Sequence, residues 1–322
     1  MKKKILILGV TGQDGSILAD YLVKKKYKVY GLIRKSSNRN YANINNLINN
    51  GNFKLVRGDI LDYFSLERII KDIKPDQIYN FADQDHVSWS KDIPIYSYDV
   101  TAKSVFTLLN IIKIYSPKTK YFQPFTSNMF GGINKNKVDE SDQFNPLSVY
   151  ALSKVNAFYI CEYFKKIHNL NIFGAIFFNH ESERRTEEYV TRKITRSAVR
   201  IYLGKQKYIY LGDITSKIDW GYAKDYVLAA YKMMNLKKPD FFIIGSGKAY
   251  SVEYFLKHSF QYLGLNYKKY LKINKALIRK KKNRTLVANT SKAKKIIKFK
   301  PSINLQQLIK IMIDNDLKLE ND

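Results

Sequence analysis

The chain has 322 residues and a formal net charge of +28, and 45% of its residues are hydrophobic. This length suits one large α/β domain with a smaller one appended, and the apolar share allows a sizeable core. So basic a chain can bind nucleic acid, membranes or anionic metabolites. Because its lysines are spread along the whole chain, we interpret them mainly as a solvated surface. We expect an anionic small-molecule substrate, and neither nucleic acid nor a membrane as partner.

The cysteine and histidine contents exclude two kinds of site. The single cysteine, Cys161, cannot form an internal disulfide, and it fits a reducing compartment and a place in the core. The four histidines are scattered without metal-ligand spacing, so we expect no metal. No long apolar run or secretory signal stands out, and we therefore expect a soluble cytoplasmic protein.

A glycine-rich turn follows the first predicted strand, Ile5–Leu8, and precedes a helix predicted from Ser16. The turn has the spacing Gly-x2-Gly-x2-Gly, in the strand–turn–helix context of a dinucleotide fingerprint. Glycines allow a tight turn and the close approach of a pyrophosphate, which sits at the helix N-terminus. We expect the cofactor to contact Gly9, Thr11, Gly12, Gln13, Asp14 and Gly15.

Cations and hydroxyls follow the second predicted strand, residues 28–33. A cofactor with a free ribose usually meets an acidic residue here, whereas a 2′-phosphate prefers an arginine. The chain instead has Arg34, Lys35, Ser36 and Ser37. We therefore predict NADP(H), with Arg34, Ser36 and Ser37 on the phosphate.

Two more strands, residues 53–56 and 77–82, should also end beside the cofactor, because ligands bind at the carboxyl ends of strands in open α/β sheets. After the first, Asp59 can accept a hydrogen bond from the adenine amino group, and Ile60 lies next to it. After the second comes a short polar cluster, residues 83–87, that should face the cofactor or the substrate. We expect the cofactor at Ala82 and Gln84, and the substrate at Ser90.

The predicted chemistry lies on a fifth strand, residues 121–126, and on a helix over residues 148–168. The strand delivers Thr126, Ser127 and Asn128, and the helix carries Tyr150 and Lys154. Residues four apart share one helix face, so a phenol lies beside an ammonium. A free tyrosine ionises near pH ~10, and a neighbouring cation favours its phenolate. A lowered phenol pKa would suit a general base acting on a sugar hydroxyl, which the short hydroxyls would hold.

The alternation of strands and helices predicts an α/β fold: a doubly wound parallel sheet (Rossmann) with a smaller C-terminal α/β substrate domain. We expect a long helix over 96–115 and a sixth strand over 171–178. Residues 1–178 should bind NADP and carry the catalytic helix, whereas 179–322 should mainly bind substrate. Part of the chain near 210–230 should return to the first domain, with a helix opening at Asp219. The basic run 275–284 fits a solvated loop or a substrate contact equally well.

Several segments carry a resemblance to a known family, and those at 179–182 and 190–194 are far more specific than the glycine turn. The segments are residues 12–16, 34–37, 75–80, 179–182, 184–185, 190–196 and 219–226. Through them the chain resembles the GDP-mannose 4,6-dehydratase family, in the extended short-chain dehydrogenase group of sugar-nucleotide enzymes. The resemblance runs from the first strand to at least Asp225, and more weakly to Pro301. The Asn-His-Glu-Ser segment at 179 and the Val-Thr-Arg-Lys-Ile segment at 190 are typical of GDP-sugar members.

The resemblance implies roles for the residues that match. The sugar would be held and oxidised at C4, the nucleotide would lie along the second domain, and the loop after the second strand would hold the 2′-phosphate. That loop also contacts a neighbouring subunit in this family, which favours a homotetramer over the homodimer that two long helices commonly form. The implied residues are Thr126, Tyr150 and Lys154 at C4, Asn179, Val190, Lys193 and Arg279 along the nucleotide, and His180 beside the cofactor.

Departures from the family concern the site itself. The family has Thr-Ser-Glu where this chain has Asn128, and that glutamate removes the C5 proton. An amide cannot take a proton at neutral pH, but Asp85 stands where the family has serine. We hypothesise that Asp85 replaces the lost base. Where the family has an arginine before Asp-Trp-Gly, this chain has Ile218, and Lys217 is the adjacent cation.

Three functions stay open at this point. The first is a GDP-sugar 4,6-dehydratase acting on GDP-mannose, another GDP-hexose or an N-acetylated one. The second is a GDP-sugar epimerase or 4-ketoreductase, which needs Tyr150 and Lys154 but no base at Asn128. The third is a redox-sensing binding protein that has lost its chemistry, which the intact Thr126, Tyr150 and Lys154 disfavour.

Overall fold

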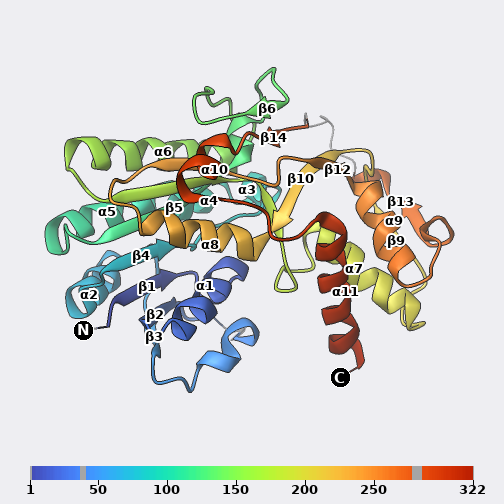
Figure 1. Cartoon of the computed structure of the whole chain (residues 1–322), viewed down its shortest axis with the longest axis horizontal. Helices are drawn as coiled ribbons and strands as arrows, with labels where there is room; N and C mark the ends of the chain where they lie inside the picture. Colours follow the sequence, from blue (N-terminus) through green and yellow to red (C-terminus); the bar gives the residue numbers. More distant parts are fainter. Residues whose placement is uncertain (1, 37–40, 278–284, 322) are drawn as a thin grey trace.

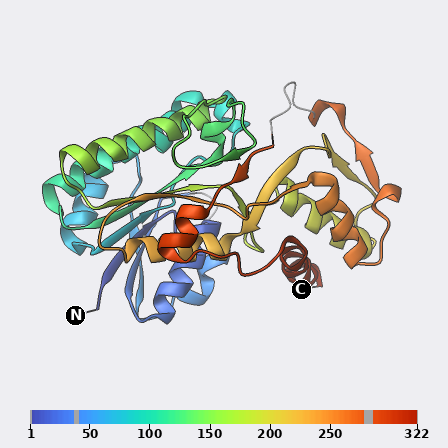
Figure 2. The same ribbon diagram turned by 45° about the horizontal axis from the view of Figure 1, so that its top comes forward.

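The structure is a computed structural model, and it describes residues 2–36, 41–277 and 285–321. The chain forms a larger lobe around a central sheet and a smaller lobe beside it, and the C-terminal helix belongs to the smaller lobe (Figure 1). The view in Figure 2 shows the same two lobes side by side. None of the helices in these described ranges is long and apolar enough to cross a membrane.

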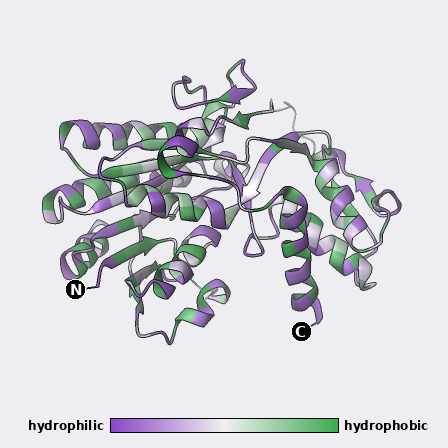
Figure 3. Cartoon of the chain, viewed as in Figure 1, coloured by the Kyte–Doolittle hydropathy of each residue, from purple (hydrophilic) through white to green (hydrophobic). Residues whose placement is uncertain are grey.

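The larger lobe is built on a central parallel sheet. Within the described residues this sheet has seven strands, in the order β11-β7-β5-β4-β1-β2-β3. The order reverses between β1 and β4, where ligands bind in folds of this kind. Apolar runs such as Ile5–Leu8 are fully buried because helices cover both faces of the sheet. Figure 3 shows this as hydrophobic colour along the central strands. The strands are β1 Lys4–Leu8, β2 Lys28–Ile33, β3 Phe53–Arg57, β4 Gln77–Asn80, β5 Lys120–Thr126, β7 Ile172–Phe177 and β11 Phe241–Ile244.

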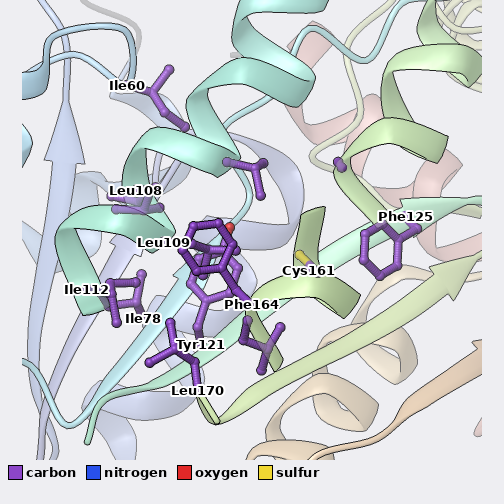
Figure 4. Packing of buried hydrophobic residues seen from close by; sticks show 14 of the residues in the cluster. Ile60, Ile78, Leu108, Leu109, Ile112, Tyr121, Phe125, Cys161, Phe164 and Leu170 are labelled. Atoms are coloured by element: carbon purple, nitrogen blue, oxygen red, sulfur yellow. The ribbon is translucent and has the colours of Figure 1, made fainter. Parts of the chain in front are cut away.

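Helices pack on the two faces of this sheet and form two apolar cores. One core contains α1 Gln13–Lys24 and α8 Ala223–Met234, with α10 Ser291–Ile297 at its edge. The other contains α2 Tyr63–Ile73, α5 Ser104–Tyr115 and α6 Val149–Ile167. Cys161 lies in the second core among Phe164, Tyr121 and their neighbours (Figure 4), which confirms the predicted core position. Burial raises the pKa of its thiol.

The smaller lobe packs three helices around a third apolar core: α7 Val190–Tyr202, α9 Val252–Tyr262 and α11 Leu305–Asn321. A buried ion pair between Arg192 and Asp316 joins α7 to α11. The remaining strands are short: β8 Asn179–Glu181, β10 Lys217–Tyr222 and β12 Ala249–Ser251 in one sheet, β9 Ile209–Leu211 with β13 Leu271–Ile273, and β6 Lys137–Val138 with β14 Val287–Ala288. Other helical segments are α3 Trp89–Asp92, α4 Pro94–Tyr98, and 3-10 turns at Ala42–Leu47, Ser127–Phe130, Tyr267–Lys269 and Lys275–Leu277.

Asn179, the predicted domain boundary, falls at the start of β8. Beyond it, α8 packs against α1, and β11 pairs with β7, so residues 223–244 lie against the larger lobe. The division into a cofactor domain and a substrate domain stays a prediction.

The helix predicted over 96–115 is interrupted. A π-helical segment, Asp99–Lys103, separates α4 from α5. The Ser104 hydroxyl donates to the Val100 carbonyl oxygen at 2.5 Å, and the Thr101 hydroxyl donates to the Asp83 carboxylate at 2.6 Å. The Ser104 bond to a backbone carbonyl competes with regular helical bonding, and single π-turns often occur near functional sites.

The prediction that a helix opens at Asp219 is wrong. Asp219 lies in β10, and the helix begins at Ala223. The Asp219 carboxylate is buried and accepts backbone N–H groups from Ser246, Gly247 and Ala288 at 2.8, 3.0 and 3.1 Å. The strand itself is formed by pairing of β10 with β8 and with β12, which belong to other segments, so the local sequence does not reveal it.

Candidate active site

A cavity of about 2030 Å³ opens at the carboxyl ends of the central strands and extends onto the smaller lobe. It brings together most of the residues predicted from sequence. Gln84 and Ser90, both within the described residues, lie outside its wall, while Ser37 and Arg279 fall outside the described residues. The predicted residues that line it are Gly9, Thr11, Gly12, Gln13, Asp14, Gly15, Arg34, Ser36, Asp59, Ile60, Ala82, Asp85, Thr126, Ser127, Asn128, Tyr150, Lys154, Asn179, His180, Val190, Lys193 and Lys217.

The glycine turn fits a diphosphate because its backbone packs too tightly for side chains. Gly9 has φ +74°, and a Cβ there would lie 2.5 Å from the Phe81 carbonyl oxygen. A Cβ on Gly15 would lie 2.3 Å from the Gly9 carbonyl oxygen. The turn leads into the N-terminus of the 12-residue helix α1, which favours an anion.

Two side chains of this turn hold the segment after β7. The Ser182 hydroxyl donates to the Gln13 side-chain oxygen at 2.8 Å. His180 lies 2.8 Å from the Asp14 carboxylate and 2.8 Å from the Phe178 carbonyl oxygen, and its ring stacks on Tyr226. Burial acts against the charged ring, but Asp14 outweighs it, so the pKa of His180 lies above its ordinary value. Burial likewise acts against the Asp14 carboxylate, but His180 outweighs it and lowers the pKa of Asp14.

At the other end of the cofactor site, Arg34, Lys35 and Ser36 are exposed on the cavity wall. The Arg34 guanidinium donates to the Tyr96 hydroxyl at 3.1 Å, which joins this loop to α4. The Asp59 carboxylate accepts the Leu61 N–H at 2.9 Å and is thereby fixed after β3.

The catalytic candidates lie where β5 and α6 meet. The Thr126 hydroxyl oxygen accepts the side-chain amide of Asn128 at 3.1 Å. Tyr150 is buried in the first turn of α6, a helix that Ser148 caps by accepting the Ala151 N–H at 3.1 Å. The Ser90 hydroxyl oxygen accepts the Tyr150 N–H at 3.3 Å, so Ser90 supports the start of this helix from behind the cavity.

Lys154 has a partner that the sequence analysis missed. Its ammonium forms an ion pair with the Asp83 carboxylate and donates to the Pro124 carbonyl oxygen at 2.9 Å. The side chains of Lys154 and Asp83 are only 3% and 12% exposed. The polar cluster after β4 was the available signal for Asp83, but only spatial pairing shows which member meets Lys154.

The prediction that the pKa of the Tyr150 phenol is lowered is wrong. Burial raises the pKa of Tyr150 well above its ordinary value, and the Asp83 and Asp85 carboxylates raise it further. The Lys154 Nζ lies 5.8 Å from the centre of the Tyr150 ring, but its charge is offset by Asp83. A cation on the same helix face therefore does not lower the pKa of the phenol when a carboxylate is paired with that cation.

A second acid–base cluster lies nearby, and of its members only Asp85 was predicted to have a role; Glu181, Arg185 and Tyr189 were not. The Arg185 guanidinium lies 3.5 Å from the Asp85 carboxylate, 3.4 Å from Glu181 and 3.4 Å from the centre of the Tyr189 ring. Glu181 is buried, which raises its pKa, and it accepts the Thr191 hydroxyl at 2.8 Å. The Asp85 side chain is 54% exposed.

The nucleotide candidates Asn179, Val190, Lys193 and Lys217 lie on the β8–α7–β10 side of the cavity. Apolar side chains, including Leu211, Trp220 and Leu277, line the same region. Cations beside an apolar wall suit a nucleoside diphosphate. No group of three or more His, Cys, Asp or Glu that could hold a metal ion occurs in the described parts of the chain.

The family profile described as GDP-mannose 4,6 dehydratase matches residues 6–312. The chain belongs to this family. It is 42% identical to GDP-mannose 4,6 dehydratase 2 of Arabidopsis thaliana over 99% of its length and 88% of the relative. It is 35% identical to the human GDP-mannose 4,6 dehydratase, covering 98% of this chain and 91% of that one.

Solved structures of sugar-nucleotide enzymes share the fold. The dTDP-glucose 4,6-dehydratase of Bacillus anthracis, in complex with NAD, aligns with a TM-score of 0.87 at 22% identity, covering 99% of this chain and 98% of that one. The UDP-glucose 4-epimerase of Thermotoga maritima aligns with a TM-score of 0.87 at 23% identity, covering 98% and 99%.

The His180–Asp14 pair gives a pH-dependent prediction. Because the pKa of His180 is raised in the folded chain, its stabilisation is complete below about pH 6.5, the ordinary histidine value, and is lost as pH rises through the folded value. His180→Phe keeps an aromatic ring on Tyr226 but removes the ion pair. Urea unfolding should show a loss of roughly 1–3 kcal/mol at about pH 6 and a smaller loss at about pH 9.

The matched control is His258→Phe, because His258 bonds the Tyr254 carbonyl oxygen at 2.8 Å. The loss of unfolding free energy in His258→Phe should not decline in this way between the two pH values. Equal losses for His180→Phe at both pH values would contradict the assignment.

Proposed function

We propose that this protein is an NADP-dependent GDP-sugar 4,6-dehydratase that acts on GDP-mannose, a related GDP-hexose or an N-acetylated one. The observation that carries the proposal is the convergence of Thr126, Tyr150 and Lys154 on one cavity in a chain matched by the family over residues 6–312. The product would be a GDP-4-keto-6-deoxy sugar.

The residues that would hold the cofactor are the glycine turn, for the pyrophosphate, and Arg34 with Ser36, for the 2′-phosphate. A guanidinium makes charge-assisted bonds to phosphate, which supports NADP over NAD. When bound, the cofactor supplies a reversible hydride store, so that none is consumed over a full turnover.

Tyr150 would accept the proton of the C4 hydroxyl while the Thr126 hydroxyl orients the same oxygen. Oxidation at C4 gives a ketone, which acidifies the C5 proton. A base then removes that proton, and the C6 hydroxyl takes up a proton and leaves as water. Hydride returned to C6 and a proton returned to C5 complete the product, so the two protons taken from the C4 hydroxyl and from C5 are both used. The atoms balance as loss of one water.

Asp85 is our candidate for the C5 base. The Asn128 amide cannot act as one, and it donates to Thr126 at 3.1 Å. The Asp85 carboxylate lies on the wall of the same cavity, half-exposed, with the Arg185 guanidinium 3.5 Å away to fix its position. It is close enough to Tyr150 to influence the pKa of that phenol.

The alternative is a GDP-sugar epimerase or 4-ketoreductase. Asn128 favours it, because these reactions need Tyr150 and Lys154 but no base at that position. The two classes differ in product mass and in cofactor consumption, and the first test below separates them.

We also propose a cytoplasmic homodimer or homotetramer whose only ligands are the cofactor and the GDP-sugar, without nucleic acid or membrane. The single buried Cys161 fits a reducing compartment. Large apolar side chains stand exposed on α5 and α6, where a second copy of the chain would cover them. They are Phe106, Ile114, Tyr159, Tyr163 and Ile167.

The function is tested by incubating the protein with GDP-mannose and a trace of NADP, followed by mass spectrometry. The expected product has lost one water with no net cofactor consumption. Tyr150→Phe should lower turnover by about 10²–10⁴-fold. A product of unchanged mass would indicate an epimerase. No product from GDP-mannose, together with stoichiometric consumption of NADPH when a GDP-4-keto sugar is supplied, would indicate a 4-ketoreductase.

Cofactor selectivity is tested by Arg34→Ala. Hydrogen bonds to charged groups contribute about 1.5–3 kcal/mol, so NADP affinity should fall by roughly 10–100-fold while NAD affinity changes little. Titration calorimetry measures both. Arg68→Ala is the control, because Arg68 donates to the Arg57 carbonyl oxygen on the surface. Equal affinity of the parent protein for NADP and NAD would contradict the NADP proposal.

The base is tested by Asp85→Asn, which keeps the side-chain shape. General-base help is worth about 10²–10⁴ in rate, so dehydration and solvent-deuterium exchange at C5 should fall together while substrate binding survives. Glu188→Gln is the matched control, since Glu188 is another exposed carboxylate on the cavity wall. Normal exchange in Asp85→Asn, or its loss in Glu188→Gln instead, would show that Asp85 is not the base.

A further inference from the structure

The ion pair of Lys154 and Asp83 occupies the centre of the catalytic group. Asp83 follows β4, and its carboxylate also accepts the Thr101 hydroxyl at 2.6 Å and the Gln84 N–H at 2.8 Å. Lys154 donates in addition to the Pro124 carbonyl oxygen. Both side chains line the cavity, so each faces the place where the cofactor and the sugar would meet.

This pair changes the electrostatic environment of Tyr150. A lone Lys154 would favour the phenolate, but an ammonium joined to a carboxylate carries little net charge. The other groups that face Tyr150 do not replace the lost positive charge. Asp85 is an anion that is itself paired with the Arg185 guanidinium at 3.5 Å, Tyr189 is a neutral phenol, and the Thr126 hydroxyl supplies one hydrogen bond.

We propose that Asp83 is a positioning residue that holds Lys154 in a neutral ion pair and so makes proton acceptance by Tyr150 depend on the positive charge of the oxidised nicotinamide ring. This inference rests on the proposed role of Tyr150 as the base at C4. The proton passes from the C4 hydroxyl to the Tyr150 phenolate oxygen, and Asp83 itself exchanges no proton with the substrate.

Two consequences follow from charge alone. Removing the Asp83 carboxylate leaves Lys154 as an uncompensated cation, so the pKa of Tyr150 should fall. The same cation would repel the oxidised, positively charged ring more than the reduced, neutral one. Asp83→Asn should therefore alter cofactor preference as well as the pH profile. A purely structural role, for instance supporting Thr101 in the π-helical segment, predicts neither effect.

The experiment measures the dissociation constants of NADP+ and NADPH for the full chain, without any sugar, by fluorescence titration. In Asp83→Asn the ratio of the NADP+ constant to the NADPH constant should rise by about tenfold, a typical effect of one poorly screened charge. Lys154→Met leaves the carboxylate unpaired and should shift the ratio the opposite way. Asp83→Glu should restore the parent ratio, and Thr101→Val should leave it unchanged.

A second readout is the pH dependence of hydride transfer in a single turnover of the holoenzyme with GDP-mannose. Its rising limb should move to lower pH in Asp83→Asn. If neither Asp83→Asn nor Lys154→Met moves the cofactor ratio, the proposal is overturned, and each variant tests it alone should the other fail to fold. The cofactor ratio is measured without sugar, so it tests this proposal independently of the dehydratase proposal. Failure of the dehydratase proposal would be recognised from the reaction products of the parent enzyme.

Discussion

A steric constraint at the end of β1 determines how closely the glycine turn and α1 approach the end of β4. The chain turns into α1 in a space that admits no side chain at Gly9 or Gly15, because the Phe81 and Gly9 carbonyl oxygens fill it. The turn thus brings the N-terminus of α1 against the end of β4, at the point where the strand order reverses. Asp83 and Asp85 follow that strand directly, and Thr126 ends the next one. Cofactor, acid–base groups and sugar would therefore meet at one edge of the sheet.

Local patterns were sufficient to predict the parts of this site that lie within one segment. The glycine turn and the Tyr150–Lys154 face depend on spacing along a few residues, and the structure brings both to the cavity. Pairings between distant segments were not predictable. The sequence places Lys154 beside Tyr150, but only the fold buries Tyr150 and brings Asp83 to Lys154. Burial first, and the Asp83 carboxylate second, reverse the expected direction of the phenol pKa. Asp219 shows the same limit, since its strand β10 depends on pairing with β8 and β12, which belong to other segments of the chain.

The charge of the whole chain does not describe the site. Although the net charge is +28, the cations nearest the chemistry are each paired: Lys154 with Asp83, and Arg185 with Asp85 and Glu181. The site thus contains carboxylates that the net charge of the whole chain does not reveal.

The central claim is that hydride taken from C4 of a GDP-sugar is returned to C6 of the same molecule. The most direct test is to convert GDP-mannose carrying deuterium at C4 and to locate the label in the product by NMR. The account predicts deuterium at C6 of a product that has lost water. Label restored to C4 with the C6 hydroxyl intact, or lost to the cofactor pool, would contradict it.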